Sequence, residues 1–411
     1  MEQEAAPTAS LWENRAFLRL WFAHAVSGLG TRVTDLALPL TAVLVLDATP
    51  AQMGALVFAG QLPDLLFGLL AGAWVDRRRR RPLLVGSDLG RAVLLSAVPL
   101  AAATDRLSFP LLWIVAFGSG LLHLVFTLAS VALLPAIVKG EQLVEANSKL
   151  AISDSVLTLA GPSVAGVLVQ VVSAPKAILA DCLSFVVSAG ALGRIGSAEP
   201  DALPRRQRPS LRAEIGEGLR ALVETPLLAV LAVSMGIIVV AGAVQATVNI
   251  LYLTRSLGLS PAEIGVVTAA GGVGSLLGAV LASRLATGVG TGIAIIAGAG
   301  LGTVSILLVP IAGRTSLPLP VLLLGQSLFG VGYALFSINQ ISLRQRITPV
   351  HLMGRVTASR RFVIFCMAPL GAALGGWLGG RIGLAPTLVV AAVISAGGVL
   401  VMLFSSVRRV A

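Results

Sequence analysis

Apolar and polar positions are grouped along this chain in long blocks and do not alternate residue by residue. Long runs with almost no charge are separated by short polar segments rich in arginine. A helix needs about 20 apolar residues to cross a bilayer, where its backbone polar groups can pair only within the helix. The pattern predicts an all-α membrane protein with twelve such helices, at about residues 17–46, 52–75, 83–104, 109–137, 148–172, 175–195, 226–253, 261–284, 291–313, 318–346, 356–381 and 384–407.

Composition favours a membrane protein and disfavours several other classes. The hydrophobic fraction is 56% and the charged fraction is 12%, about half of what soluble globular chains carry. The sequence contains no phosphate-binding G-x-x-x-x-G-K-[ST] motif and no histidine-rich cluster, which disfavours a nucleotide-driven pump or a membrane enzyme. Both cysteines, Cys182 and Cys366, lie within apolar runs, so we expect no disulfide, no metal site and no cofactor.

The basic residues are distributed unevenly between alternate loops, which indicates orientation. If the N-terminus is cytoplasmic, the loops on that side contain Arg77–Arg81, Lys139, Arg205, Arg206, Arg208, Arg284, Arg344, Arg346, Arg355, Arg408 and Arg409. The opposite loops contain only Arg106, Lys176, Arg255, Arg314 and Arg381. This is the positive-inside asymmetry, and an even number of spans places both termini in the cytoplasm. The net charge of +11 is thus a topology signal, and its spread over short loops argues against nucleic-acid binding.

The chain also repeats weakly at half its length. The stretch at 66–77, "LFGLLAGAWVDR", aligns with the stretch at 273–284, "VGSLLGAVLASR". Such similarity is typical of transporters built from two parallel halves. We therefore expect a six-helix half at 1–195, a cytoplasmic linker at 196–225 and a second six-helix half at 226–411. The later part of the linker has its apolar residues on one face, which predicts a helix lying on the membrane surface.

One loop motif points to a family. Gly72, Asp76, Arg77, Arg80 and Arg81 form a G-x-x-x-D-R-x-x-R-R pattern between the second and third spans. With twelve spans in two halves, the chain resembles the major facilitator superfamily over nearly its whole length. Within that superfamily it is similar to the enterobactin-exporter-like and macrolide-efflux-like drug exporters. Two stretches of this chain carry that similarity, "LVEANSKLAISDSVLTLAGPSVAGVLVQ" and "LRQRITPVHLMGRVTASRRF".

A second stretch, "AGPSVAG" in the fifth span, resembles the motif associated with exporters. It contains Gly161, Pro162 and Gly166, while Leu157 and Ala165 stand where the motif has further glycines. The resemblance implies a monomeric transporter in the bacterial inner membrane that works by alternating access. Its driving force would be the proton gradient, its partners a small-molecule substrate and the lipid bilayer.

The loop motif has a physical interpretation within the arrangement that the resemblance implies, where Asp76 lies against the start of the eleventh span. A carboxylate there gains roughly 0.3–1 kcal/mol from the helix dipole, so Asp76 would be a latch of the cytoplasmic gate. Arg77 and Arg80 would pair with carboxylates at the cavity mouth, for which Asp88 is a candidate. The alternative is that the arginines only fix topology, and we favour it for Arg78 and Arg79.

Polar residues follow one face of the first, fourth, seventh and tenth spans. Polar groups that face lipid are costly, so these stripes should face protein or water. In the superfamily these four helices line the central cavity. The candidate cavity residues are His24, Thr31, His123, Thr127, Gln245, Asn249, Gln326, Tyr333 and Gln340. One such residue alone is more often a hydrogen bond between helices, but four stripes on equivalent helices predict a substrate cavity.

Three charges lie near the middle of predicted spans, namely Arg32, Asp35 and Asp64. Arg32 and Asp35 are three residues apart on one helix and can pair, which leaves one carboxylate over. Desolvation favours the protonated form of a carboxylate without a full partner. That property suits a proton carrier or a site for a cationic substrate, and a neutralised structural cluster is the alternative.

We therefore predict a secondary active transporter that exports amphipathic small molecules, drugs or natural products, by proton-coupled antiport. The alternative is a dedicated exporter of a single siderophore or secondary metabolite. Transport of a compound panel would separate broad from narrow recognition, while ATP hydrolysis stimulated by substrate would favour a nucleotide-driven pump.

Overall fold

The structure is a computed structural model, which describes residues 11–75, 77–138, 140–196, 220, 224–348 and 353–410. The predicted surface helix in the linker lies outside the described residues, as does Asp76 of the loop motif.

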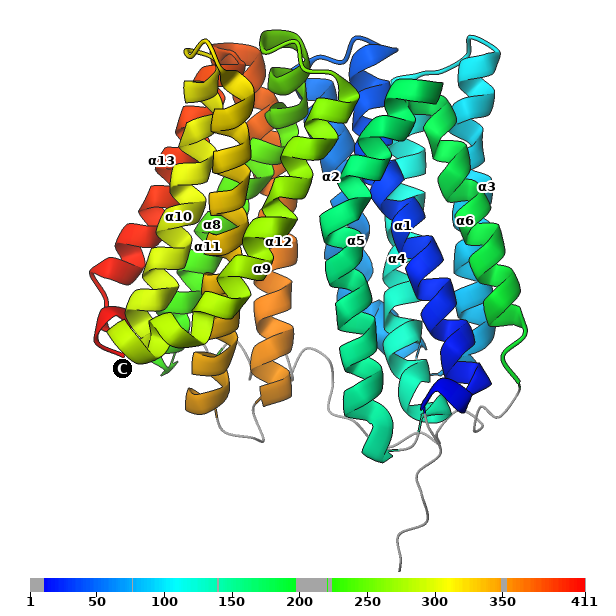
Figure 1. Ribbon diagram of the computed structural model, residues 1–411, viewed down its shortest axis with the longest axis horizontal. Helices are drawn as coiled ribbons and strands as arrows, with labels where there is room; N and C mark the ends of the chain where they lie inside the picture. Colours follow the sequence, from blue (N-terminus) through cyan, green and yellow to red (C-terminus); the bar gives the residue numbers. More distant parts are fainter. Residues whose placement is uncertain are drawn as a thin grey trace, which may run out of the picture.

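The described residues form twelve helices of 20 to 30 residues (Figure 1). The first six are α1 Arg15–Leu44, α2 Pro50–Val75, α3 Arg80–Ala103, α4 Phe109–Ile137, α5 Leu143–Val172 and α6 Ala174–Gly193. The second six are α8 Pro226–Leu251, α9 Pro261–Val289, α10 Thr291–Ala312, α11 Pro318–Ile347, α12 Met353–Ile382 and α13 Leu384–Leu403. Short helical turns are η1 Leu11–Glu13, η2 Gly140–Gln142, η3 Tyr252–Ser256 and η5 Ser406–Arg409.

These helices confirm the spans that the apolar pattern predicts. The largest differences in bounds are five residues, at the start of α5 and at the end of α9. Among the described residues, nine of the helices are long and apolar enough to cross a membrane. The other three, α1, α2 and α12, are 30, 26 and 30 residues long, which is enough to span a bilayer.

Local sequence explains where several helices begin. The side chain of Asn14 accepts hydrogen bonds from the backbone N–H groups of Ala16 and Phe17 and so caps α1. Ser260 and Glu263 form a capping box at the start of α9. Proline stands at the first position of α8, α9 and α11, where a missing backbone N–H costs nothing.

The two six-helix halves pack together most closely toward one end of their helices. We call the side where α1 begins and the C-terminus lies the terminal side, and the other the opposite side (Figure 1). Near the opposite side, α2 packs on α12 and α5 packs on α9. Arg255 forms an ion pair with Asp47 of the other half, and the side chain of Gln170 accepts a 3.2 Å hydrogen bond from the N–H of Ala262.

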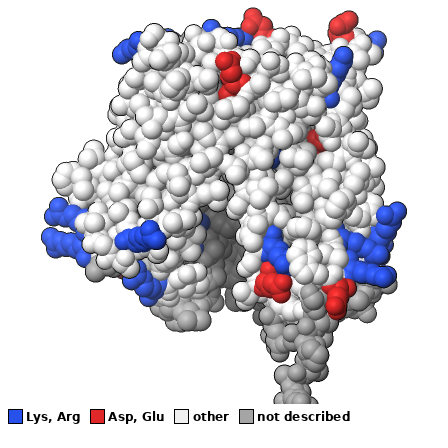
Figure 2. Space-filling model, in the orientation of Figure 1, with Lys and Arg blue, Asp and Glu red and all other residues white. Residues whose placement is uncertain are grey.

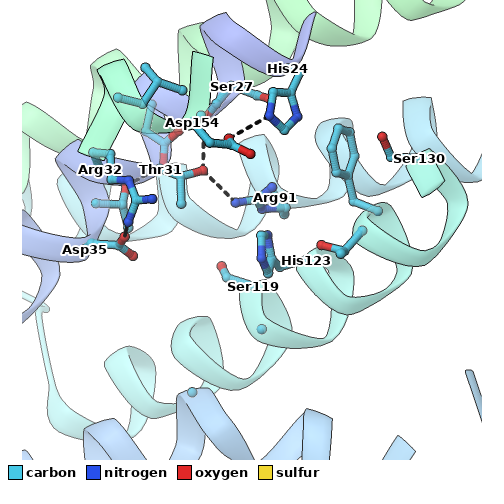
Figure 3. Close-up of a pocket in the computed structure, with 18 of the residues that line it drawn as sticks. His24, Ser27, Thr31, Arg32, Asp35, Arg91, Ser119, His123, Ser130 and Asp154 are labelled. Atoms are coloured by element: carbon cyan, nitrogen blue, oxygen red, sulfur yellow. Dashed lines mark hydrogen bonds and ion pairs between the residues drawn. The ribbon is translucent and has the colours of Figure 1, made fainter. Parts of the chain in front are cut away.

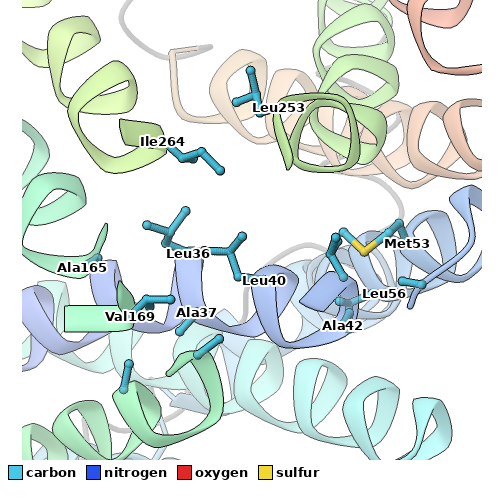
Figure 4. Packing of buried hydrophobic residues seen from close by; sticks show 14 of the residues in the cluster. Leu36, Ala37, Leu40, Ala42, Met53, Leu56, Ala165, Val169, Leu253 and Ile264 are labelled. Carbon is cyan, nitrogen blue, oxygen red and sulfur yellow. The ribbon is translucent and has the colours of Figure 1, made fainter. Parts of the chain in front are cut away.

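The buried apolar clusters show the same asymmetry. The largest cluster joins both halves, with Leu36, Leu40 and Val169 from the first half and Leu253 and Ile264 from the second (Figure 4). Toward the terminal side, each half instead has a buried cluster of its own, one around Leu20 and Leu133, the other around Ile295 and Leu343. The molecule is therefore closed at the opposite side, and Figure 2 shows it hollowed between the halves at the terminal side.

Candidate functional site

One large cavity, of about 860 Å³, lies within the first half and is lined by residues of α1 to α6. Its wall combines apolar groups, such as Leu38, Val57 and Phe126, with charged and polar ones. Figure 3 labels several of the charged and polar residues. The volume falls in the range of sites for drug-sized ligands. Both the size and the mixed wall suit an amphipathic molecule.

The polar stripe of α1 forms one wall of this cavity. His24 lies 2.8 Å from Asp154 of α5, between Nε2 and Oδ1 (Figure 3). Arg32 lies 3.7 Å from Asp35, and it also donates a 3.3 Å hydrogen bond to the hydroxyl of Thr158. The Asp35 side chain is 58% exposed, so it can reach whatever enters the cavity. The pairing of Arg32 with Asp35, which the spacing allows, is therefore observed.

The structure adds an arginine that the sequence reasoning did not single out. Arg91 of α3 is 5% exposed, and its Nη2 donates a 3.0 Å hydrogen bond to the hydroxyl of Thr31. Its guanidinium carbon lies 3.9 Å from the centre of the Phe185 ring, a close cation–π contact. The carboxylates that act on its charge are Asp181, Asp88 and Asp35. Arg91 thus connects α1, α3 and α6 at the cavity wall.

Two carboxylates of this region were also missed. Asp154 stands on α5 opposite His24, and Asp181 of α6 accepts hydrogen bonds from the hydroxyls of Thr34 and Ser184. Each is the only acidic residue within a predicted apolar span, a signal that by itself marks a candidate functional position in a membrane helix. The lining thus holds Asp35, Asp154 and Asp181 against Arg32 and Arg91, an excess of one carboxylate.

Only the candidate cavity residues of the first half line the observed cavity. His123 and Thr127 of α4 line the cavity, together with Ser119 and Ser130. The candidates of the second half lie outside its lining. Gln245 and Asn249 are partly buried on α8, and Gln326 is partly buried on α11. Tyr333 is exposed, and its ring stacks on that of Phe329 with 6.2 Å between the ring centres. Gln340 is buried and accepts a 3.4 Å hydrogen bond from Arg360. The cavity is therefore lined by residues of the first half alone.

The loop motif is described in part. Gly72 has no atom within 4 Å of the place where a Cβ would stand, Arg77 is exposed, and Arg80 is partly buried. Arg81 donates a hydrogen bond to the carbonyl of Gly193, which ties the start of α3 to the end of α6. These contacts fix the geometry of the loop at the terminal side.

The expected pairing of Asp88 with Arg77 or Arg80 is wrong. Asp88 lies roughly two turns into α3, is 0% exposed, and neither of its oxygens has a hydrogen-bond partner among the described residues. The groups that face it are Ser188 and Arg91. Three residues separate Asp88 from Arg91, so the helix itself brings the carboxylate toward Arg91 and away from the mouth.

The exporter-like motif of α5 lies at two close contacts. A Cβ on Gly161 would stand 2.7 Å from the side chain of Arg32, so this glycine makes room for the arginine. A Cβ on Gly166 would stand 2.4 Å from the carbonyl oxygen of Pro261 in the other half. The carbonyl oxygen of Pro162 would likewise stand 2.4 Å from a Cβ on Gly265. Asp64 is partly buried on α2 and does not line the cavity.

Comparison with known protein families decides the family. The model of the Major Facilitator Superfamily matches residues 20–248 and 233–410. This chain belongs to the major facilitator superfamily. It is a non-enzymatic transporter with the all-α fold of that superfamily, twelve membrane helices in two six-helix halves, as the sequence predicts.

Relatives within the major facilitator superfamily include efflux proteins. The chain is 27% identical to the multidrug efflux pump Tap of Mycolicibacterium fortuitum, over 90% of this chain and 91% of Tap. It is 25% identical to macrolide efflux protein A of Streptococcus pyogenes, over 50% of this chain and 53% of that protein. The fold is similar to that of a bacterial homologue of the iron transporter ferroportin in its inward-facing state, with a TM-score of 0.76, 20% identity and coverage of 96% and 99%. The two efflux proteins agree with the resemblance to drug exporters that the sequence shows.

Proposed function

We propose that this transporter exports amphipathic small molecules, drugs or natural products, by alternating access. The observation that carries the proposal is the cavity of about 860 Å³, whose wall offers both apolar surface and charged side chains. Likeness to Tap over 90% of the chain supports export over uptake. In this account the transporter works as a monomer.

The orientation of the chain is part of the same proposal. We place the terminal side in the cytoplasm, because the described basic side chains gather there (Figure 2). The open side then faces the cytoplasm of a bacterial inner membrane, and the closed side faces outward. A substrate enters the cavity from the cytoplasm or the inner leaflet, and the halves rock about it to open the opposite side.

Export against a gradient needs an energy source, and we propose proton antiport with Asp35 as the carrier. Asp35 lies in the cavity wall, is more than half exposed to it, and is held by one arginine at 3.7 Å. In the outward-open state, a carboxylate in this position can take up a proton from outside the cell. In the inward-open state, it can release that proton to the cytoplasm. Protonation also frees Arg32 from its partner, which changes the charge that the substrate meets.

The test is intracellular accumulation of a compound panel in a pump-deficient host, with and without a protonophore. We expect lower accumulation of several unrelated amphipathic compounds, and loss of that difference when the protonophore is added. Export of one compound only would favour the alternative, a dedicated exporter of a single siderophore or secondary metabolite. The proposal would be contradicted if export continued in the presence of the protonophore and if substrate stimulated ATP hydrolysis by the purified protein.

A further inference from the structure

Arg344, in the last turn of α11, is a buried cation for which the described residues supply no carboxylate partner. Its side chain is 7% exposed, and its Nε and Nη1 atoms are buried with no hydrogen-bond partner among the described residues. Arg91 in the first half shows the contrast, because it has a hydroxyl, an aromatic ring and three carboxylates around it. An ionised group in an apolar interior is costly unless it is paired or hydrogen-bonded.

A small cavity adjoins this guanidinium. It has a volume of about 10 Å³ and lies between α8, α11 and α12, where it is lined by Leu228, Leu231, Ala232, Gln340, Arg344 and Arg360. Nη1 of Arg360 donates a 3.4 Å hydrogen bond to the side-chain carbonyl of Gln340. Two guanidinium groups and one amide therefore surround the same void, and leucine and alanine side chains close its other wall.

The second half cannot neutralise Arg344 with its own carboxylates. From Pro226 to Ala411 the sequence contains eleven arginines and a single acidic residue, Glu263. The Glu263 carboxylate accepts hydrogen bonds from the N–H and the hydroxyl of Ser260 at the start of α9, which lies at the opposite side. Arg344 stands 26 residues into α11, about 39 Å along a helix that also begins at the opposite side. The compensating negative charge has to come from outside the half.

We propose that the void beside Arg344 is a binding site for a small monovalent anion of halide size, such as chloride. A void of about 10 Å³ accommodates the centre of roughly one water-sized group. A phosphate or sulfate, with four oxygens, is too large for it, whereas a halide fits and supplies the missing charge. A water molecule would accept hydrogen bonds but would leave the guanidinium charge uncompensated.

The site is distinct from the cavity of the proposed export function. None of its six lining residues lines that cavity, and it lies in the other half. A bound anion neutralises the charge of Arg344 at the terminal end of the second half, where α8, α11 and α12 meet. Loss of anion binding therefore leaves the proposed substrate cavity intact, and the two proposals can fail separately.

The test measures thermal unfolding of the purified full-length protein in neutral detergent, titrated with sodium chloride against sodium gluconate at equal ionic strength. A ligand that binds the folded state raises the midpoint in a saturable way. We expect a saturable rise of a few degrees with chloride and with bromide, and none with gluconate. The rise should disappear in Arg344→Gln and persist in Arg346→Gln, since Arg346 is exposed and already donates to the Thr291 hydroxyl at 2.7 Å.

Anomalous scattering from crystals of the wild-type protein grown in bromide provides a second readout, which holds even if Arg344→Gln fails to fold. A bromide peak between Arg344 and Gln340 supports the proposal. Absence of that peak, equal midpoints in chloride and gluconate, or a chloride effect that survives Arg344→Gln overturns it. A midpoint that rises only on addition of phosphatidylglycerol also overturns it, because the ligand is then a lipid phosphate.

Discussion

Gly166 and Gly265 bring the backbones of α5 and α9 into direct contact across the two halves. A Cβ on Gly166 would stand 3.0 Å from the Cα of Gly265 and 2.4 Å from the Pro261 carbonyl oxygen. A second pair, Gly54 of α2 and Gly376 of α12, shows the same relation, with 2.9 Å from a Cβ on Gly54 to the Cα of Gly376. Small residues let membrane helices approach closely, so the closed side depends on these positions having no side chain.

Gly166→Ala should therefore open the opposite side. The added methyl meets backbone atoms, which cannot rotate away, and overpacking of this kind costs about 1–3 kcal/mol. That cost shifts the equilibrium away from the closed state roughly 5- to 150-fold. We expect faster labelling of a cysteine at Ser119 by a membrane-impermeant maleimide added from outside, because Ser119 lines the cavity.

Gly190→Ala is the matched control for this prediction. Gly190 lies on α6, and no atom stands within 4 Å of the place of its Cβ. Its labelling rate should equal that of the parent protein. Equal rates for Gly166→Ala and Gly190→Ala would mean that the contact between α5 and α9 does not hold the closed state.

Asp154→Asn should weaken the export of cations more than that of neutral compounds. An asparagine oxygen can still accept the hydrogen bond from His24, so the link between α1 and α5 remains while one negative charge leaves the cavity wall. Because the Asp154 side chain is 57% exposed, solvent screens it, and we expect about 1 kcal/mol, or roughly fivefold, for a monovalent cation. Efflux of a cationic dye and a neutral analogue measures the difference.

Glu145→Gln serves as the control for the removal of a charge from α5. Glu145 pairs with Lys149 at 3.3 Å outside the cavity lining, so both compounds should be exported as by the parent protein. If Asp154→Asn slowed both compounds equally, the carboxylate would act on the fold of the half and not on the charge of the substrate.

Asp76→Asn should leave abundance in the membrane near that of the parent protein but slow transport greatly. In the arrangement that the resemblance implies, Asp76 lies at a helix start, where a carboxylate gains only roughly 0.3–1 kcal/mol. That gain is small for the fold but would be decisive for a gate that closes in every cycle. Arg79→Ala should have little effect, because the Arg79 side chain is exposed. Initial efflux rates normalised to protein abundance provide the measurement, and an unchanged rate in Asp76→Asn would exclude the latch.

Topology can be tested by labelling single cysteines from outside the cell. The background needs Cys182→Ser and Cys366→Ser, since both cysteines are free thiols. We expect an impermeant maleimide to modify a cysteine at position 314 and not one at position 79. The reverse pattern would invert the whole account, since the open side would then face outward.

The apolar pattern was sufficient to predict the twelve helices because each span must satisfy its backbone internally. It also gave the stripe of α1 and the spacing of Arg32 and Asp35, since both follow from one helix alone. The contacts of Arg91 and Asp181 could not be predicted in this way, because they depend on how α1, α3 and α6 pack. Asp88 illustrates the limit, as its position in the sequence places it near the mouth while its face of α3 directs it toward Arg91.

The exposure of Arg32 and Asp35 leads to a prediction about the stability of Asp35→Asn. Removing one partner of a fully buried ion pair costs about 3–5 kcal/mol, but Arg32 and Asp35 are 40% and 58% exposed. An exposed pair contributes about 1 kcal/mol or less. Asp35→Asn should therefore accumulate in the membrane like the parent protein. A large loss of yield that Arg32→Gln restores would instead show that the pair holds the fold.

Proton-driven uptake of substrate into inverted membrane vesicles tests the central claim most directly. With a pH gradient imposed, the parent protein should concentrate both a cationic and a neutral compound inside the vesicles. Asp35→Asn should still bind both compounds, as measured by fluorescence quenching in detergent, but should lose uptake driven by the gradient. Full gradient-driven uptake of both compounds by Asp35→Asn would contradict the assignment of Asp35 as the proton carrier.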